Sequence, residues 1–185
     1  MNLPFSRRTQ FVLLGIVVIV VLLVASLGLS YNTLVSKDQN VSAQWAQVEN
    51  QIQRKFDLIP QLVTISKDYQ QFEKTLLQNL TALRSAWTNH SGIPQGMNLS
   101  NLASLFLANW VSVVENNPDL KSIQVIEDLF FEVTGTENRI AFERLRYNDG
   151  VRDFNTAVLS FPSNIAAGLF GFQQRPYFDP IPGGP

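Results

Sequence analysis

The sequence predicts an all-α protein in which an N-terminal transmembrane helix continues into an antiparallel bundle of about four long helices. Three observations lead to this fold class. Residues 11–29 form an uncharged apolar run, and apolar residues then recur at helical spacing as far as Pro162. No stretch alternates polar and apolar residues for long enough to indicate a sheet.

The uncharged run is predicted to cross a membrane, because its nineteen residues span roughly 30 Å of hydrocarbon. The alternative is a cleaved secretory signal, but the apolar core of such a signal is only about 7–15 residues long. Arg7 and Arg8 precede the run, and the next charges are Lys37 and Asp38. The positive-inside rule therefore favours a cytoplasmic N-terminus, and we expect a single-pass protein of the cell membrane with its bulk outside the cytoplasm.

The chain is expected to have four parts. They are a short cytoplasmic N-terminus (residues 1–10), the transmembrane helix (11–30), the helical-bundle domain (31–160), and a C-terminal segment that is first apolar and then rich in Pro and Gly (161–185).

Within the bundle, the anchor is expected to run on as a long helix until Pro60 interrupts it, because proline disfavours helix in the preceding residue. A second helix should follow Pro60 and reach Trp87. Residues 88–98 lack periodicity and should form the widest loop. A third, shorter helix should come next, before Asn117-Pro118-Asp119 opens a fourth helix of about 40 residues.

Charged and amide side chains fall on the predicted apolar faces of the second and fourth helices. By spacing from their apolar neighbours, the inward-facing set is Glu73, Arg84, Glu137, Arg144, Asn148 and Asn155. One interpretation is a binding or proton-handling site, since isolated buried charges are costly. The interpretation that we favour is an interhelical polar network that determines which helix faces which.

Composition excludes several kinds of chemistry. The chain has no Cys, so it has no disulfide, thiolate nucleophile or Cys metal ligand. A formal net charge of −1 argues against nucleic acid as a partner. The single histidine, His90, lies in the predicted loop, and Lys37, Lys67, Lys74 and Lys121 lack an apolar setting that would activate them. We predict no catalytic residue, no metal and no cofactor.

The C-terminal segment begins as apolar as a core but follows a helix-ending proline. It could fold back on its own bundle, dock on a neighbouring copy, or lie at a membrane interface. The residues expected to carry self-association are Phe161, Ile165, Leu169, Phe170 and Phe172.

Several motifs occur together and in order along the chain. They are Trp45-Ala46-Gln47-Val48, Arg54-Lys55-Phe56-Asp57-Leu58-Ile59-Pro60, Pro118-Asp119-Leu120-Lys121, Gly135-Thr136-Glu137-Asn138-Arg139-Ile140, Arg144 with Tyr147-Asn148, and Phe161-Pro162-Ser163-Asn164. With these motifs the sequence resembles the LemA family. The resemblance implies a membrane-anchored, mostly helical protein without established enzymatic activity. The family motif places an acid at Glu73, arginines at Arg84 and Arg144, and a Thr-Glu-Asn triplet that includes Glu137, the same charges that spacing directs inward. Lys55, Gln61, Asn117 and Phe130-Phe131 depart from the family pattern.

We therefore expect a non-enzymatic envelope scaffold or adaptor that self-associates or presents a helical surface to other membrane proteins. Its expected partners are the lipid bilayer, a second copy of the chain and other membrane proteins. The alternative is an extracytoplasmic ligand-binding or sensory bundle that uses the inward charges. A role as accessory of a membrane protease rests on the family resemblance alone.

Overall fold

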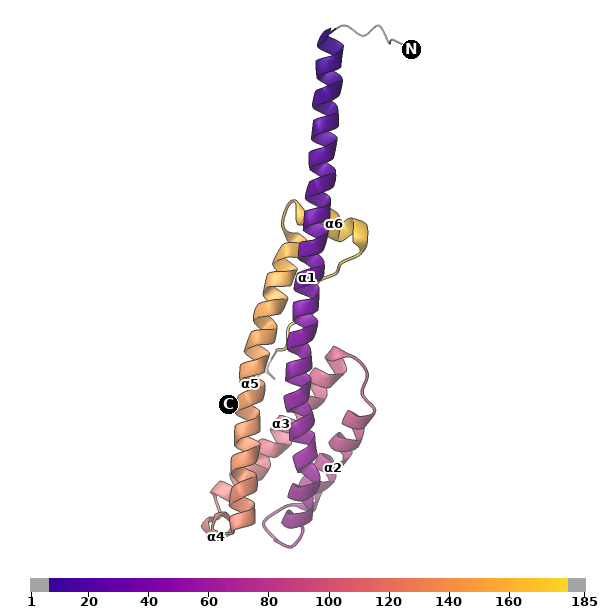
Figure 1. Cartoon of the computed structure of the whole chain (residues 1–185). Helices are drawn as coiled ribbons and strands as arrows, with labels where there is room; N and C mark the ends of the chain where they lie inside the picture. Colours follow the sequence, from indigo (N-terminus) through magenta and orange to yellow (C-terminus); the bar gives the residue numbers. More distant parts are fainter. Residues whose placement is uncertain (1–6, 180–185) are drawn as a thin grey trace. The chain divides into compact units, whose positions relative to one another are not determined.

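The computed structural model describes residues 7–179, with the side chains of Arg7 and Arg8 left out. This part of the chain contains helices and no strand, so the all-α prediction is confirmed (Figure 1). The helices are α1 (Arg7–Ser66), α2 (Lys74–Thr88), α3 (Ile93–Glu115), α4 (Pro118–Lys121), α5 (Gln124–Leu159) and α6 (Ser163–Phe170).

The chain divides into two compact units, and each is described by itself. Of the described residues, the anchor unit comprises residues 7–41 and 150–175, and the bundle unit comprises residues 42–149 and 176–179. Helices α1 and α5 contribute residues to both units.

In the anchor unit, α1 carries the apolar run. Its large apolar side chains from Phe11 to Val24 are all exposed, with Leu13 at 47% and Phe11 at 72%. Helix α3 also meets the length and composition expected of a membrane span, but a third of its apolar stretch is buried inside the protein. The exposed, uncharged surface of α1 instead indicates anchoring in a membrane, because exposing such a large apolar area to water is energetically unfavourable.

Helix α1 continues through Pro60, so the predicted interruption is wrong. Proline removes one backbone hydrogen bond from a helix interior. Phe56, Ile59 and Leu62 around it are almost completely buried, and the free energy of this packing outweighs the local cost. The helix ends at Ser66 instead, and α2 begins at Lys74 rather than directly after Pro60.

In the bundle unit, α2 and α3 form a hairpin (Figure 1). The connection is short because α3 already begins at Ile93, with Gly92 at φ 75° before it and Pro94 in its first turn, so the broad loop predicted for residues 88–98 is wrong. The predicted fourth helix is likewise divided, since α4 ends at Lys121 and α5 begins at Gln124.

Aromatic side chains form much of the bundle core. The ring of Phe56 stacks on Trp87 with centroids 4.9 Å apart, and Phe72 stacks on Trp110 at 5.8 Å. The buried Trp110 indole donates a 2.8 Å hydrogen bond to the hydroxyl of Ser66. These contacts pack the end of α1 against α2 and α3.

Candidate functional site

A lysine is buried in the middle of the bundle unit. Lys55 lies on the same face of α1 as Ile52 and Ile59, which are three residues before it and four after it, and its side chain is 1% exposed. Lysine is almost never fully buried unless its ammonium group is paired.

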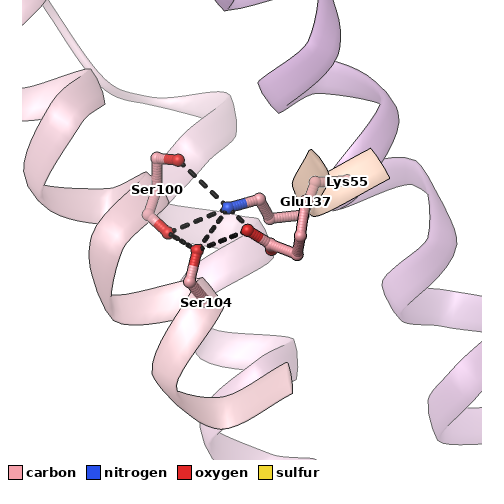
Figure 2. Close-up of polar contacts among 4 residues, drawn as sticks. All are labelled: Lys55, Ser100, Ser104 and Glu137. Atoms are coloured by element: carbon pink, nitrogen blue, oxygen red, sulfur yellow. Dashed lines mark hydrogen bonds and ion pairs between the residues drawn. The ribbon is translucent and has the colours of Figure 1, made fainter. Parts of the chain in front are cut away.

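Two helices, α3 and α5, supply the partners of this ammonium group (Figure 2). Lys55 Nζ donates to Ser104 Oγ at 2.7 Å and to both the hydroxyl and the backbone carbonyl of Ser100 at 3.1 Å. It also forms an ion pair with Glu137 Oε1 at 3.0 Å, and the Ser104 hydroxyl lies 2.9 Å from Glu137 Oε2. We call Lys55, Ser100, Ser104 and Glu137 the Lys55 cluster. It connects α1, α3 and α5.

Burial and the neighbouring charges shift the pKa of Lys55 in opposite directions. Burial lowers the pKa of Lys55 because it removes water from the ammonium group, and the nearby guanidinium of Arg144 lowers it further. The carboxylate of Glu137 acts to raise this pKa, by its charge and by its hydrogen bond, but burial is the larger effect. The Glu137 side chain is 31% exposed, although Oε1, the oxygen paired with Lys55, is itself buried.

A groove lies beside the cluster, with a volume of about 470 Å³. Residues of α3 and α5 form its walls, and Phe178 of the C-terminal segment contributes to it. Its lining combines apolar side chains such as Leu107, Val133 and Ile140 with the polar groups of Ser104, Glu137 and Arg144. We call it the α3–α5 groove.

Arg144 lies half-buried in this groove, with its guanidinium carbon 5.9 Å from the centre of the Phe178 ring. Within residues 7–179 no carboxylate forms an ion pair with it. The structure thus brings two of the predicted residues, Glu137 and Arg144, into one groove, but only Glu137 has an oppositely charged partner.

The prediction that Glu73 and Arg84 point inward is wrong, since both are exposed. Glu73 precedes α2 at its N-cap, so the helical spacing that placed it on a buried face does not apply. Arg84 keeps the spacing of the apolar stripe of α2, four residues after the buried Leu80 and three before the buried Trp87, yet it is exposed. Its long side chain reaches a second, polar hollow of about 570 Å³, which Glu49, Asp57 and His90 also line.

The two predicted asparagines each hold backbone of the C-terminal segment. In the bundle unit, the Asn148 amide donates to the carbonyl of Phe178 at 3.0 Å and accepts from its N–H at 2.8 Å. The buried ring of Phe178 lies 6.2 Å from the ring of Trp45, and the Tyr147 hydroxyl donates to Pro176 at 2.9 Å.

In the anchor unit, Asn155 makes the same pair of bonds with Arg175, at 2.9 and 2.8 Å. The Arg175 guanidinium in turn donates to both carboxylate oxygens of Asp38, at 2.9 and 3.0 Å. Bidentate Arg–carboxylate pairs are among the stronger polar contacts in proteins.

The predicted self-association residues are also in the anchor unit. Phe170 and Phe172 contact the ring of Tyr31, with centroids 4.6 and 5.9 Å apart. Ala166 and Ala167 are buried, whereas Phe161, Ile165, Leu169 and Phe170 remain exposed. Contacts within the chain therefore bury only part of the apolar surface of this segment.

Sequence reasoning missed Lys55, Ser100 and Ser104. The signal for Lys55 was its position on the apolar stripe of α1, where a lysine needs a buried anion or several acceptors. Across residues 7–179 no group of three or more His, Asp or Glu side chains is arranged to hold a metal ion.

Similarity to known proteins identifies the family of this chain. Residues 44–182 match the model of the LemA family, which is three quarters of the chain. The chain belongs to the LemA family. The resemblance inferred from the sequence motifs is thereby confirmed.

Among its similar relatives in this family are magnetosome proteins MamQ 1 and MamQ 2 of Paramagnetospirillum magneticum. Each is 24% identical over 191 residues, covering 89% of this chain and 70% of the relative. Magnetosome protein MamQ of Magnetospirillum gryphiswaldense is 22% identical over 201 residues, covering 95% of this chain and 74% of the relative. LemA membership and the apolar α1 together support a membrane-associated helical protein.

Proposed function

We propose that this LemA-family chain is a non-enzymatic, membrane-anchored adaptor that binds a segment of another membrane protein in its α3–α5 groove. The observation that carries the proposal is the groove itself, whose surface is mostly apolar in area, with polar side chains among its lining, and whose volume is about 470 Å³. Such a concave apolar surface with a few polar groups is typical of binding sites.

The Lys55 cluster supports an adaptor rather than an enzyme. Its ammonium group, hydroxyls and carboxylate bond to one another, as expected of a network that holds helices in a defined arrangement. The Ser104 hydroxyl lies between Lys55 and Glu137, and both hold it in place. The network therefore stabilises the groove walls.

A second candidate is binding of a small anionic ligand, and Arg144 favours it. A half-buried guanidinium without a carboxylate partner in the described residues would suit a carboxylate or phosphate group. The two candidates share the groove but differ in the size of the occupant.

Photo-crosslinking in native membranes tests the proposal, with a photoreactive amino acid in place of Leu105 or of Leu102. Both lie on α3 and are exposed to nearly the same extent, 45% and 43%, but only Leu105 lines the groove. We expect one defined membrane protein crosslinked at position 105 and none at position 102.

Equal labelling at the two positions would contradict the adaptor. A product made of two copies of this chain would instead assign the groove to self-association. A small anion released from the purified protein, and lost in Arg144→Met, would favour the second candidate.

A further inference from the structure

We infer that α6 lies in the headgroup region of the membrane and binds the bilayer surface through Ile165, Leu169 and Phe170, together with the preceding Phe161. The inference rests on the membrane anchoring included in the proposed function, but not on the groove. All of its observations come from the anchor unit.

The depth of α6 follows from its contact with α1. The apolar run ends at Leu29, which is 70% exposed, and Tyr31 follows two residues later. The rings of Phe170 and Phe172 lie against Tyr31, and α6 lies across α1 at this level (Figure 1). Tyrosine is enriched where hydrocarbon gives way to headgroups. The interfacial layer is roughly 5–8 Å thick on each side of the hydrocarbon core, so α6 falls within it.

The outer surface of α6 is apolar and uncharged, as expected of a helix that lies in the interfacial layer. Its inner face consists of small residues, since Ala166 and Ala167 are 0% and 2% exposed. Ile165 and Leu169, four residues apart, are 48% and 67% exposed, and Phe170 is 58% exposed. The stretch from residue 154 to residue 174 contains no charge. Water would solvate this surface poorly, whereas the boundary between acyl chains and headgroups would bury it.

The first charges on either side mark the outer limit of this layer. Along α1 the first charge is Lys37, about 12 Å beyond Leu29 at 1.5 Å per residue, and the next is Asp38, at about 13 Å. It is paired with Arg175, the first charge after α6. This ion pair lies beyond the interfacial thickness, where water and polar headgroups can solvate it.

Continuity with the span is the reason to assign the bilayer, rather than a second copy, as the occupant. The exposed residues of α6 lie next to Tyr31 of α1, and residues 11–25 of that helix are all exposed and uncharged. A bilayer that covers residues 11–29 also reaches this level without any further partner.

Spin labels measure this placement in full-length protein reconstituted in lipid nanodiscs. The chain has no Cys, so Ile165→Cys and Leu169→Cys each give one labelling site. Leu22→Cys reports the span, and Leu102→Cys is a matched apolar control in the bundle unit. The measured quantity is the ratio of the label's collision rate with oxygen to its collision rate with a water-soluble nickel complex.

We expect this ratio at positions 165 and 169 to be several-fold higher than at position 102 and lower than at position 22. A ratio equal to that at position 102 would overturn the inference. Strong dipolar broadening between labels on two copies would also overturn it and assign α6 to self-association. If the label at position 22 is itself exposed to nickel, the membrane anchoring in the proposed function fails as well, so the two failures are distinguishable.

Discussion

The ammonium nitrogen of Lys55 lies 3.0 Å from the carboxylate of Glu137, and the two side chains share the hydroxyl of Ser104. Their exposures differ widely, since Lys55 is 1% exposed and Glu137 is 31% exposed. Lys55 is therefore cut off from water more completely than Glu137. The folded state should therefore lose more stability when Lys55 loses its partner than when Glu137 does. The free energy of unfolding of single variants measures this asymmetry.

Glu137→Leu should destabilise the protein more than Lys55→Met. The first change leaves a buried ammonium without its counter-charge and should cost roughly 2–4 kcal/mol. The second leaves a carboxylate on a partly exposed side chain that keeps the hydrogen bond from Ser104, and should cost about 1 kcal/mol. Chemical denaturation of the detergent-solubilised chain measures both. Combining the two changes should cost less than their sum. An equal cost for the two single variants would contradict the asymmetry.

The stability that Lys55 contributes should increase with pH. Burial lowers the pKa of Lys55 in the folded state, whereas an unfolded lysine titrates near about 10.4. Between the lowered pKa and about 10.4 the unfolded chain binds more protons, so the free energy of unfolding increases as the pH rises through this window. The difference in this free energy between the native chain and Lys55→Met should grow accordingly. A decrease would mean that Glu137, and not burial, dominates the shift.

Asn148→Ala should loosen the C-terminal segment at Phe178. The change removes two hydrogen bonds, of 2.8 and 3.0 Å, and leaves the backbone N–H and carbonyl of Phe178 without these partners. Hydrogen exchange at this amide should accelerate, and the free energy of unfolding should fall by about 1–2 kcal/mol. Asn138→Ala, at an exposed position of the same helix, is the control and should leave exchange at Phe178 unchanged.

Pro60→Ala should stabilise the protein. Pro60 is exposed inside α1, and alanine there would restore a backbone donor to the carbonyl of Phe56. Since an interior proline costs about 3 kcal/mol relative to alanine, we expect a gain of roughly 1–3 kcal/mol by chemical denaturation. Gln61→Ala, at the neighbouring exposed position, should change stability very little. A loss of stability in Pro60→Ala would show that the proline ring itself is needed.

Periodicity predicted the site well where one helix runs without interruption. Along α5, Glu137 and Arg144, which the spacing from Val133 and Ile140 directed inward, are half-buried and line the α3–α5 groove, because a continuous helix keeps its faces aligned over many turns. The same reasoning failed at Glu73. The low helix propensity at Pro60 predicted that a new helix begins there, but burial of the surrounding apolar residues keeps α1 intact. Helix α2 begins only at Lys74, so the helical spacing used to place Glu73 does not apply to it.

The position of Lys55 was readable from the sequence, but its environment was not. Its partners Ser100, Ser104 and Glu137 come from two other helices, and Ser100 and Ser104 lie in the helix predicted to follow the loop at residues 88–98. A periodic pattern reports which side of a helix is buried. It does not report which polar atoms from distant segments will meet there.

The contact between Asn148 and Phe178 has a practical consequence for studying this protein. Both hydrogen bonds of the Asn148 amide involve main-chain atoms, so they recognise a peptide backbone and not a particular side chain. The neighbouring Tyr177 is 43% exposed. A fluorophore introduced at position 177 would therefore leave the amide contacts in place, and could report in real time when the C-terminal segment leaves its site.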